Sequence, residues 1–546
     1  MKKILLVLSL FFLVYLFNPV SAFAATGTWT GATNANWSNA GNWSGLGGAA
    51  PAAGDTLIFN SGSVASTIDA SFNGTASAVT INGYTGTITM ARTLTVTNNL
   101  TITTGILTTA GNTITVNGTL IMDSVSSSVG VIKSTSGNVT ISANTITNPN
   151  SSGAISSTSG SITINSTGTV GAFALPAITS DTSVSIGATT PSLSVTLNGA
   201  VTTITNSGSN SLVIKSSTGD ITTSSDIGTS ANKFAAVTIF AASTSGTGVF
   251  NQTGSSTLYG GNGGNAINID GRGGVTVQNI TVSDSPPGNV NIGTNNGGTL
   301  VTPSVTINGN ITTTTTTNGV VIKSSTGNIA LNGNIGSSSA SSQFGTVTIR
   351  ASATSGSGTF TQGGSSTIYG GLSNNTIAID SGGATTINNI IGYGTSNISI
   401  GQTAAPTSIT LNGSITQSGA VPVLLMTSAG DITANSGANM GTSGSKLGNV
   451  TITTGTSGTL HIVSGDIQSS GTSISITAST INHDAGTILV SGVSAAVSIQ
   501  SKATVGAFAL STITSSGTVS IGNTTQPTAV TLNGNVTSTN PTKILL

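Results

Sequence analysis

Two copies of a nine-residue phrase hold the most suggestive pairing of an amine with a carboxyl group in the chain. VIKSSTGDI places Lys215 ahead of Asp220, and the later copy VIKSSTGNI places Lys323 ahead of Asn328. A lysine and an aspartate at fixed spacing could supply a general acid and a general base. That chemistry needs a titratable group in each copy, and Asn328 has none.

Two further phrases end in the same way, VIKSTSGNV with Lys133 and LLMTSAGDI with Met426. Asp and Asn exchange across the four phrases, as expected of side chains that accept a hydrogen bond in a turn. The lysines align with Met426, so we expect their aliphatic stems to matter more than their amines. We interpret the exchanging positions as repeat turn positions: Asn138, Asp220, Asn328 and Asp431.

A second repeated carboxylate lies in INIDGRGG, at Asp270, and in IAIDSGGA, at Asp380. Both copies keep Asp, so these residues could form a ladder that binds a cation or a polysaccharide. The alternative is the first residue of a glycine-containing turn, and we favour it because Asp is common at that turn position. Asp270 and Asp380 are therefore also predicted to be repeat turn positions.

The remaining candidate groups form no recognisable site. GGNGGNAIN is similar to a calcium-binding nonapeptide, but Asn265 stands where the metal needs a carboxylate. His461 and His483 lie near no nucleophile motif, and we expect both on outward strand or turn positions. We predict no catalytic residue, no metal and no cofactor. A secreted β-helix lyase or hydrolase, acting on polysaccharide through charges that meet across neighbouring coils, stays as the alternative.

Composition narrows the classes of partner. The chain has 546 residues, of which 73 are Gly, none is Cys and only 4% are charged, and all 12 acidic residues are Asp. Without Lys2 and Lys3 the count is 10 basic against 12 acidic residues, a net charge of −2. We therefore predict neither nucleic-acid binding nor direct membrane insertion. Without cysteine, the fold must be held by strand ladders and stacked apolar side chains.

The segment 1–24 has the organisation of a signal peptide. Lys2 and Lys3 precede an apolar run over 4–17, and Ala22 and Ala24 form a small-x-small end. We expect cleavage after Ala24 and a secreted or cell-surface location. An uncleaved anchor helix is the alternative, although the apolar run is short for a membrane span.

From about residue 61 onward, short runs of Val, Ile and Leu alternate with Thr, Ser and Asn, and glycine-containing turns separate them. This pattern predicts an all-β chain. Four C-terminal strand cores begin at Val450, Ile474, Val497 and Val519, which are almost evenly spaced. A period of about 22–24 residues indicates a β-solenoid, with about 24 coils in a rod of about 110 Å. A string of antiparallel sandwich domains is the alternative, because Asn-Gly is also a hairpin signal.

A longer repeat is superimposed on the coils. The phrase T[LI]NG recurs with its asparagine at Asn198, Asn308, Asn412 and Asn533. We expect super-repeats of about 105–120 residues, each of four or five coils. The predicted organisation is a signal peptide (1–24), a Trp-rich cap (25–60), the first coils (61–128) and the super-repeat solenoid (129–546), which we expect to be truncated at its C-terminus.

The predicted cap holds all three tryptophans, Trp29, Trp37 and Trp43, and leads through Asp55 to Phe59. Large aromatic side chains over the first coil would cover its apolar end and protect its strand edges. A sugar-stacking platform made of the same indoles is the alternative.

The segment from TWTG through NWSNAGNWS to GDTLIF resembles the lead-in of bacterial secreted proteins with autotransporter-associated β-strand repeats. The later repeats are similar to filamentous-haemagglutinin-type and autotransporter passenger solenoids. The resemblance implies a right-handed parallel β-helix on the bacterial surface that acts in adhesion, aggregation or biofilm formation. The chain departs from these families in having no C-terminal barrel pattern, and NPN at Asn148 lacks the surrounding secretion-domain pattern.

We therefore expect a non-enzymatic extracellular adhesin or structural stalk. Its predicted partners are glycans, host or neighbouring cell surfaces, or further copies of itself, because uncharged hydroxyl and amide side chains can hydrogen-bond most sugars. An ice-binding solenoid is a minor alternative, because repeated TIT and TVT runs and the Thr312–Thr317 run could form flat threonine ladders.

Overall fold

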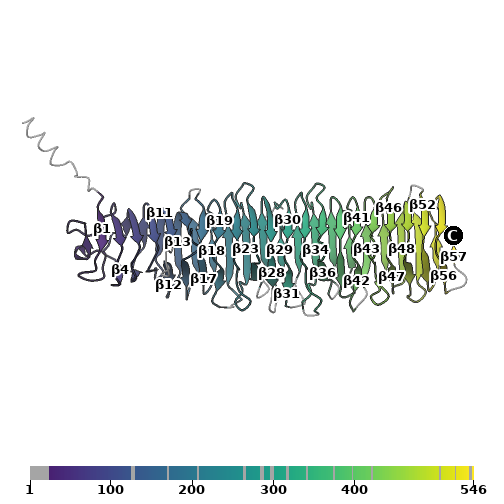
Figure 1. The fold of residues 1–546 in the computed structure, drawn as a ribbon, viewed down its shortest axis with the longest axis horizontal. Coiled ribbons are helices and arrows are strands. Elements are labelled where there is room, and N and C mark those ends of the chain that lie inside the picture. The colour runs from purple at the N-terminus through teal and green to yellow at the C-terminus, as the bar shows by residue number, and fades with distance from the viewer. Residues whose placement is uncertain are drawn as a thin grey trace, which may run out of the picture.

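The computed structural model is a long rod with its strands stacked along the axis (Figure 1). Except for Ala24, the predicted signal peptide lies outside the described residues. The structure describes residues 24–545 except 124–129, 169–170, 206–207, 262–265, 283–287, 295–300, 315–318, 340–341, 373–374, 396, 420–421, 503–505, 523 and 540–543.

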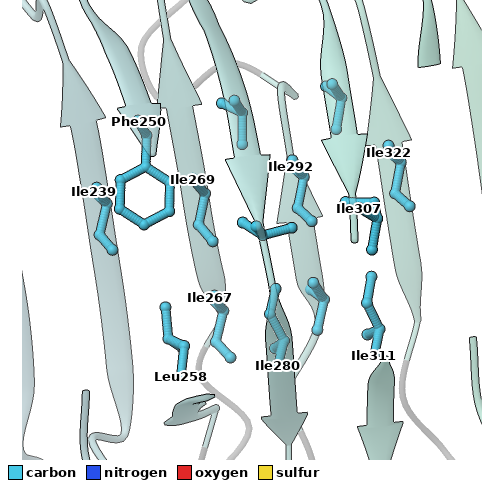
Figure 2. Packing of buried hydrophobic residues seen from close by; sticks show 14 of the residues in the cluster. Ile239, Phe250, Leu258, Ile267, Ile269, Ile280, Ile292, Ile307, Ile311 and Ile322 are labelled. Carbon is cyan, nitrogen blue, oxygen red and sulfur yellow. The ribbon is translucent and has the colours of Figure 1, made fainter. Parts of the chain in front are cut away.

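The strands form because apolar and polar residues alternate with a period of two. Strand β34 (Val347–Ala351), for example, buries Val347, Ile349 and Ala351 and turns Thr348 and Arg350 outward. Inward residues of successive strands stack into one continuous core, as Figure 2 shows for Ile239, Ile269, Ile292 and Ile322. The prediction of an all-β chain is confirmed.

Most turns of the rod add one strand to each of three columns. One such turn consists of β26 (Ile267–Gly271) in column 1, β27 (Gly274–Val277) in column 2 and β28 (Asn279–Val282) in column 3. The next turn pairs with it in parallel, through β29 (Val290–Ile292), β30 (Val305–Ile307) and β31 (Ile311–Thr313). Columns 1 and 2 are linked where β11 (Thr113–Met122) and β13 (Val139–Thr147) run through both.

Parallel pairing between turns confirms the solenoid and rules out hairpin-built sandwich domains. The four C-terminal positions used to predict the period, from Val450 to Val519, are direct partners in successive strands of column 1. Other turns are longer, such as the one that leads from Ile221 to its partner Phe250. The rod consequently has about 18 turns and not the 24 predicted. Right-handedness stays a prediction.

Column 3 is interrupted at a regular spacing. At Ile227, Ile335 and Met440 an isolated bridge replaces the strand. After each bridge the chain leaves the column in a corner loop, and it returns at Phe234, Phe344 and Leu447. Between the first two bridges column 3 holds three strands, β25 (Thr257–Gly260), β28 and β31, so this spacing corresponds to four turns.

An aromatic cluster closes the N-terminal end. Strand β1 (Thr26–Trp29) pairs in parallel with β3 (Thr56–Phe59), and the short β2 (Trp43–Ser44), which follows the 3-10 helix η1 (Ala40–Asn42), pairs antiparallel with β1. This antiparallel ribbon covers the outer edge of the first strand. The ring centroid of Phe59 lies 5.6 Å from that of Trp29 and 5.3 Å from that of Trp37.

The same cluster leaves no open indole face for a sugar. Trp29, Trp37 and Trp43 are only 4%, 0% and 6% exposed. The Trp43 Nε1 donates to the Trp37 carbonyl oxygen at 2.9 Å. The buried Asp55 carboxylate accepts from the backbone N–H groups of Ala25 at 2.9 Å and Ala52 at 2.7 Å, so it links the start of the cap to its end.

Candidate binding surfaces

The four exchanging turn positions share one geometry. In each, the side-chain Oδ1 accepts a hydrogen bond from a backbone N–H of the next turn. Either an amide or a carboxylate oxygen can do this, which accounts for the exchange of Asp and Asn. The pairs are Asn138 with Ser161 at 2.9 Å, Asp220 with Val249 at 2.8 Å, Asn328 with Thr359 at 2.9 Å, and Asp431 with Thr459 at 2.7 Å.

One of these positions lies at a different corner of the rod. Asp220, Asn328 and Asp431 each precede a strand of column 2, whereas Asn138 precedes β13 in column 1. Lys133 accordingly belongs to column 3, in β12 (Val131–Ser134). The phrase around Lys133 is therefore the same turn used at another corner, not a positional copy of the phrases around Lys215 and Lys323.

The alignment of Met426 with the lysines is wrong. Lys215 ends β21 (Ser211–Lys215) and points outward, whereas Met426 in β43 (Val423–Thr427) is fully buried. Strand pairing carries Met426 through Ile400 and the strands before it to Ile322, the inward neighbour of Lys323. The turn after β43 is one residue shorter than the turn after β21. Counting back from the aspartate therefore reaches an inward residue after β43 and an outward residue after β21. The inference about the lysine stems therefore loses its basis.

Asp270 and Asp380 are buried and do not form a ladder. They occupy the same register in β26 and β37 (Ile377–Ser381), four turns apart, so about 19 Å separates them. The Asp380 Oδ1 accepts from the backbone N–H groups of Thr403 at 3.0 Å and Ala404 at 3.3 Å. This carboxylate holds the turn that follows the next strand of column 1.

Strand pairing does bring three charged residues together on column 1. Lys323, Arg350 and Asp380 are partners on successive turns, although they lie far apart in the chain. The corresponding row four turns earlier reads Lys215, Phe240 and Asp270. Because phenylalanine replaces the arginine there, the repeat does not preserve the group. A catalytic set would have to be specific to one super-repeat.

The two histidines have different environments. His461 points outward, as predicted, and its Nε2 lies 2.9 Å from the Asp484 Oδ2. The expectation for His483 is wrong, since it is fully buried at an inward position of β49 (Thr480–His483). Burial lowers the pKa of His483 and outweighs the opposing effect of nearby backbone carbonyls and of Asp466 and Asp484. Its alternation with Ile481 in the sequence TINH is the signal that could have placed it inside.

The outer face of column 2 carries a row of threonines, named here the outer threonine row. Each member is the outward residue of a short strand and is paired with its neighbours on adjacent turns. Asn251 and Ala330 occupy the same row. The members are Thr196, Thr222, Thr276, Thr306, Thr361, Thr386, Thr410 and Thr433.

No charged side chain interrupts this row from Thr196 to Thr433, and amide ladders run beside it. The Asn332 Nδ2 donates to the Asn308 Oδ1 at 3.0 Å, and the Asn435 Nδ2 donates to the Asn412 Oδ1 at 2.6 Å. The Thr312–Thr317 run does not place all its side chains on one face, because Thr312 points outward and Thr313 is buried. Residues 315–317 of this run lie outside the described residues.

The described ranges of the chain contain neither a metal site nor a membrane-spanning helix. These ranges contain no group of three or more His, Asp or Glu side chains that could hold a metal, and no helix long and apolar enough to cross a membrane. A hollow beside the last turns is lined by Ile521, Gly522, Gln526, Pro527 and Val530, none of which is titratable.

Comparison with known proteins adds no family. No family model, curated protein or solved structure matches the chain. The fold class defined by the structure is a parallel β-solenoid with an aromatic cluster near its N-terminus.

Proposed function

We propose that the chain is a non-enzymatic extracellular repeat protein that acts as a surface adhesin or structural stalk through many weak polar contacts. The observation that supports this most directly is the uncharged outer threonine row, which repeats a hydroxyl group and a methyl group at about 4.8 Å per turn. Each contact is weak, but contacts made together along one rod add to a high avidity.

The resemblance to autotransporter-type and haemagglutinin-type repeats supports a bacterial surface location, and the signal-peptide-like segment 1–24 supports export. Glycans are the favoured partners because the row offers neutral hydrogen-bonding groups and no fixed charge. Cell surfaces and further copies of the chain remain partners under the same proposal. Nucleic acid and direct membrane insertion are not proposed, given the near-zero net charge.

The test is binding of the labelled chain to bacterial cells and to immobilised mannan, chitin and cellulose. Thr306→Lys combined with Thr386→Lys places two charges in the row, and we expect apparent affinity to fall by about tenfold or more. Ser399→Lys combined with Ser475→Lys makes the same kind of change on column 1 and is the matched control. Equal binding by both double variants, or no binding to any surface, would refute the proposal.

The same preparations distinguish the alternatives. Release of oligosaccharides from the polysaccharides would establish an enzyme, and Arg350→Ala should then abolish the release, since Arg350 is the repeat-specific member of its charged row. Thermal hysteresis or reshaped ice crystals would establish ice binding. An adhesin or stalk shows neither effect.

A further inference from the structure

One corner of the rod differs in chemistry from its two counterparts. It lies where the loop after Ile335 packs beside β36 (Thr367–Gly370) and β39 (Asn389–Gly392) of column 3. Tyr369 is an outward residue of β36, and its partner on the next turn is the outward Ile391. Outward positions elsewhere are mostly Thr, Ser or Asn, so a tyrosine ring beside an isoleucine makes a local apolar surface.

A second tyrosine joins this surface. The Tyr393 hydroxyl donates to the Ser338 carbonyl oxygen in the corner loop at 3.5 Å, which is long for such a bond. Burial raises the pKa of Tyr393 and the nearby Tyr369 adds to this, while polar contacts with Ser418 and Gln343 oppose it. The phenol is therefore neutral and already lies among polar groups at the edge of the apolar surface.

The corner loop also contributes a buried amide. Gln343 is only 1% exposed, and although it lies near Tyr393, its Nε2 makes no hydrogen bond of normal geometry among the described residues. The amide adjoins the Tyr393 phenol, so it supplies a polar group directly behind this hydroxyl. On the adjacent turn the chain passes Tyr369 at Gly336, whose φ is +74° and where an added Cβ would lie 2.8 Å from the Tyr369 carbonyl oxygen. This glycine allows the loop to pass close to the tyrosine.

We propose that Gln343, Tyr369, Ile391 and Tyr393 form a discrete subsite for one or two residues of an uncharged oligosaccharide. Tyrosine rings suit the apolar C–H face of a sugar, and the two phenols, with the buried Gln343 amide behind Tyr393, suit its hydroxyl groups. None of the four side chains is charged. The subsite therefore has no group that would pair with the negative charge of a uronic acid or a phosphorylated sugar, and we expect it to prefer neutral sugars. This inference rests on the proposed function as a glycan-binding protein, and it adds one specific binding site to the many weak contacts.

The first super-repeat supplies a natural comparison. At the equivalent positions it has Lys233 for Gln343, Tyr259 for Tyr369 and Thr281 for Ile391. Ser283 is the equivalent of Tyr393 in the sequence. Only one tyrosine of the pair is therefore present there, and a lysine replaces the neutral amide. At the third corner Gln468 stands in the place of Tyr369, so the subsite is expected once per chain, in the second super-repeat.

The test is calorimetric titration of the full chain with cellohexaose, chitohexaose and mannohexaose. We expect saturable binding of at least one of these, with one site per chain. Tyr393→Ser, which introduces the residue of the first super-repeat, should weaken that binding by about tenfold or more, and Tyr369→Ala should do the same. Tyr259→Ala is the matched control and should leave affinity unchanged. Circular dichroism checks that each variant is folded.

Three outcomes would overturn the subsite: no hexaose binds, the stoichiometry is several per chain, or Tyr393→Ser binds as tightly as the parent. Binding to whole cells and polysaccharide separates this inference from the broader one. If that binding persists in Tyr393→Ser and depends on the outer threonine row, only the subsite is wrong. If the parent chain binds neither hexaoses nor surfaces, both proposals fail.

Discussion

Single side chains at the turns act mainly as hydrogen-bond acceptors for the next turn. Besides the four exchanging positions, the Asp226 Oδ1 accepts from the Thr257 N–H at 2.7 Å and the Asn334 Oδ1 accepts from the Thr367 N–H at 2.7 Å. Both donors open strands of column 3. A strand in a solenoid begins with a backbone N–H that faces a turn rather than a ladder, and these oxygens satisfy it.

This role predicts a specific difference between two substitutions of Asp220. Asp220→Asn keeps an oxygen for the Val249 N–H and should change local stability little. Asp220→Ala removes the oxygen and should cost about 1 kcal/mol locally. Hydrogen exchange at Val249 is the measurement, with faster exchange expected in the alanine variant alone. Equal acceleration in both variants would show that the carboxylate charge, not the acceptor, matters.

The buried His483 predicts a dependence of stability on pH. Its pKa in the folded state is lowered by burial, whereas its unfolded value is about 6.5. The unfolded chain therefore binds the extra proton first, and stability falls as pH drops below about 6.5 until the folded pKa is reached. His483→Leu introduces an apolar side chain next to the inward Ile462 of the preceding turn, and it should remove this contribution to the pH dependence of stability.

Thermal unfolding between pH 8 and pH 5 tests this expectation. The control is His461→Gln on the outer face of the neighbouring strand, which should retain the fall in melting temperature. A parent chain whose melting temperature is flat over this range would count against the argument.

The tight turns between strands restrict which residues can follow a strand. After β40 (Asn397–Ile400) the chain turns sharply at Gly401, with φ at +70°, and an added Cβ would collide with the Thr427 carbonyl oxygen of the next turn. Gly437 also has a positive φ, +79°, but nothing lies within 4 Å of its Cβ position. Substitution of Gly437 should therefore cost only backbone strain, whereas substitution of Gly401 should cost backbone strain and a steric collision.

We therefore predict that Gly401→Ala destabilises the rod more than Gly437→Ala. Both variants should lose about 1 kcal/mol through the positive φ, and Gly401→Ala should lose roughly 1–3 kcal/mol more through the collision. Urea unfolding midpoints compare them directly. A similar loss in both variants would mean that the turn after β40 relaxes to accept a side chain.

The elements also show how far the sequence could be interpreted. Alternation predicts the strands, and the C-terminal period was correct because three successive turns there have similar lengths. The number of turns was overestimated because other turns hold longer loops, as between the partners Ile329 and Phe360. The match of Met426 with lysine failed for a related reason, since one missing turn residue shifts the register without changing the motif.

The candidate sites were harder to predict than the fold. The Lys323, Arg350 and Asp380 group and the Tyr369 and Tyr393 pair arise only when exact turn lengths place distant residues on adjacent turns. A repeat period known to within a few residues cannot supply that register. The acceptor role of the turn residues was accessible from the sequence because it depends on local exchange of Asp and Asn.

At the scale of the whole molecule, the rod is built from similar turns that each contact their neighbours, with a cap at the N-terminal end (Figure 1). Stability in such an array is a sum of contributions from turns and from the interfaces between them. Local damage therefore opens nearby turns without unfolding the distant ones. The aromatic cap raises the free energy needed to open the first turn.

Because neighbouring turns are joined by hydrogen bonds directed along the rod axis, a pulling force on the two ends acts on every interface at once, and an end turn, which has a neighbour on one side only, opens first. Turns should then peel off singly, each releasing the chain between two partner positions, from a short turn such as Val497 to Val519 to a long one such as Ile329 to Phe360. At about 3.5 Å for each released residue, optical tweezers should record extensions of about 75–110 Å per step. In the stalk role proposed above, stepwise release would dissipate a sudden pull in small increments, and a link between two surfaces would lengthen under flow before it failed.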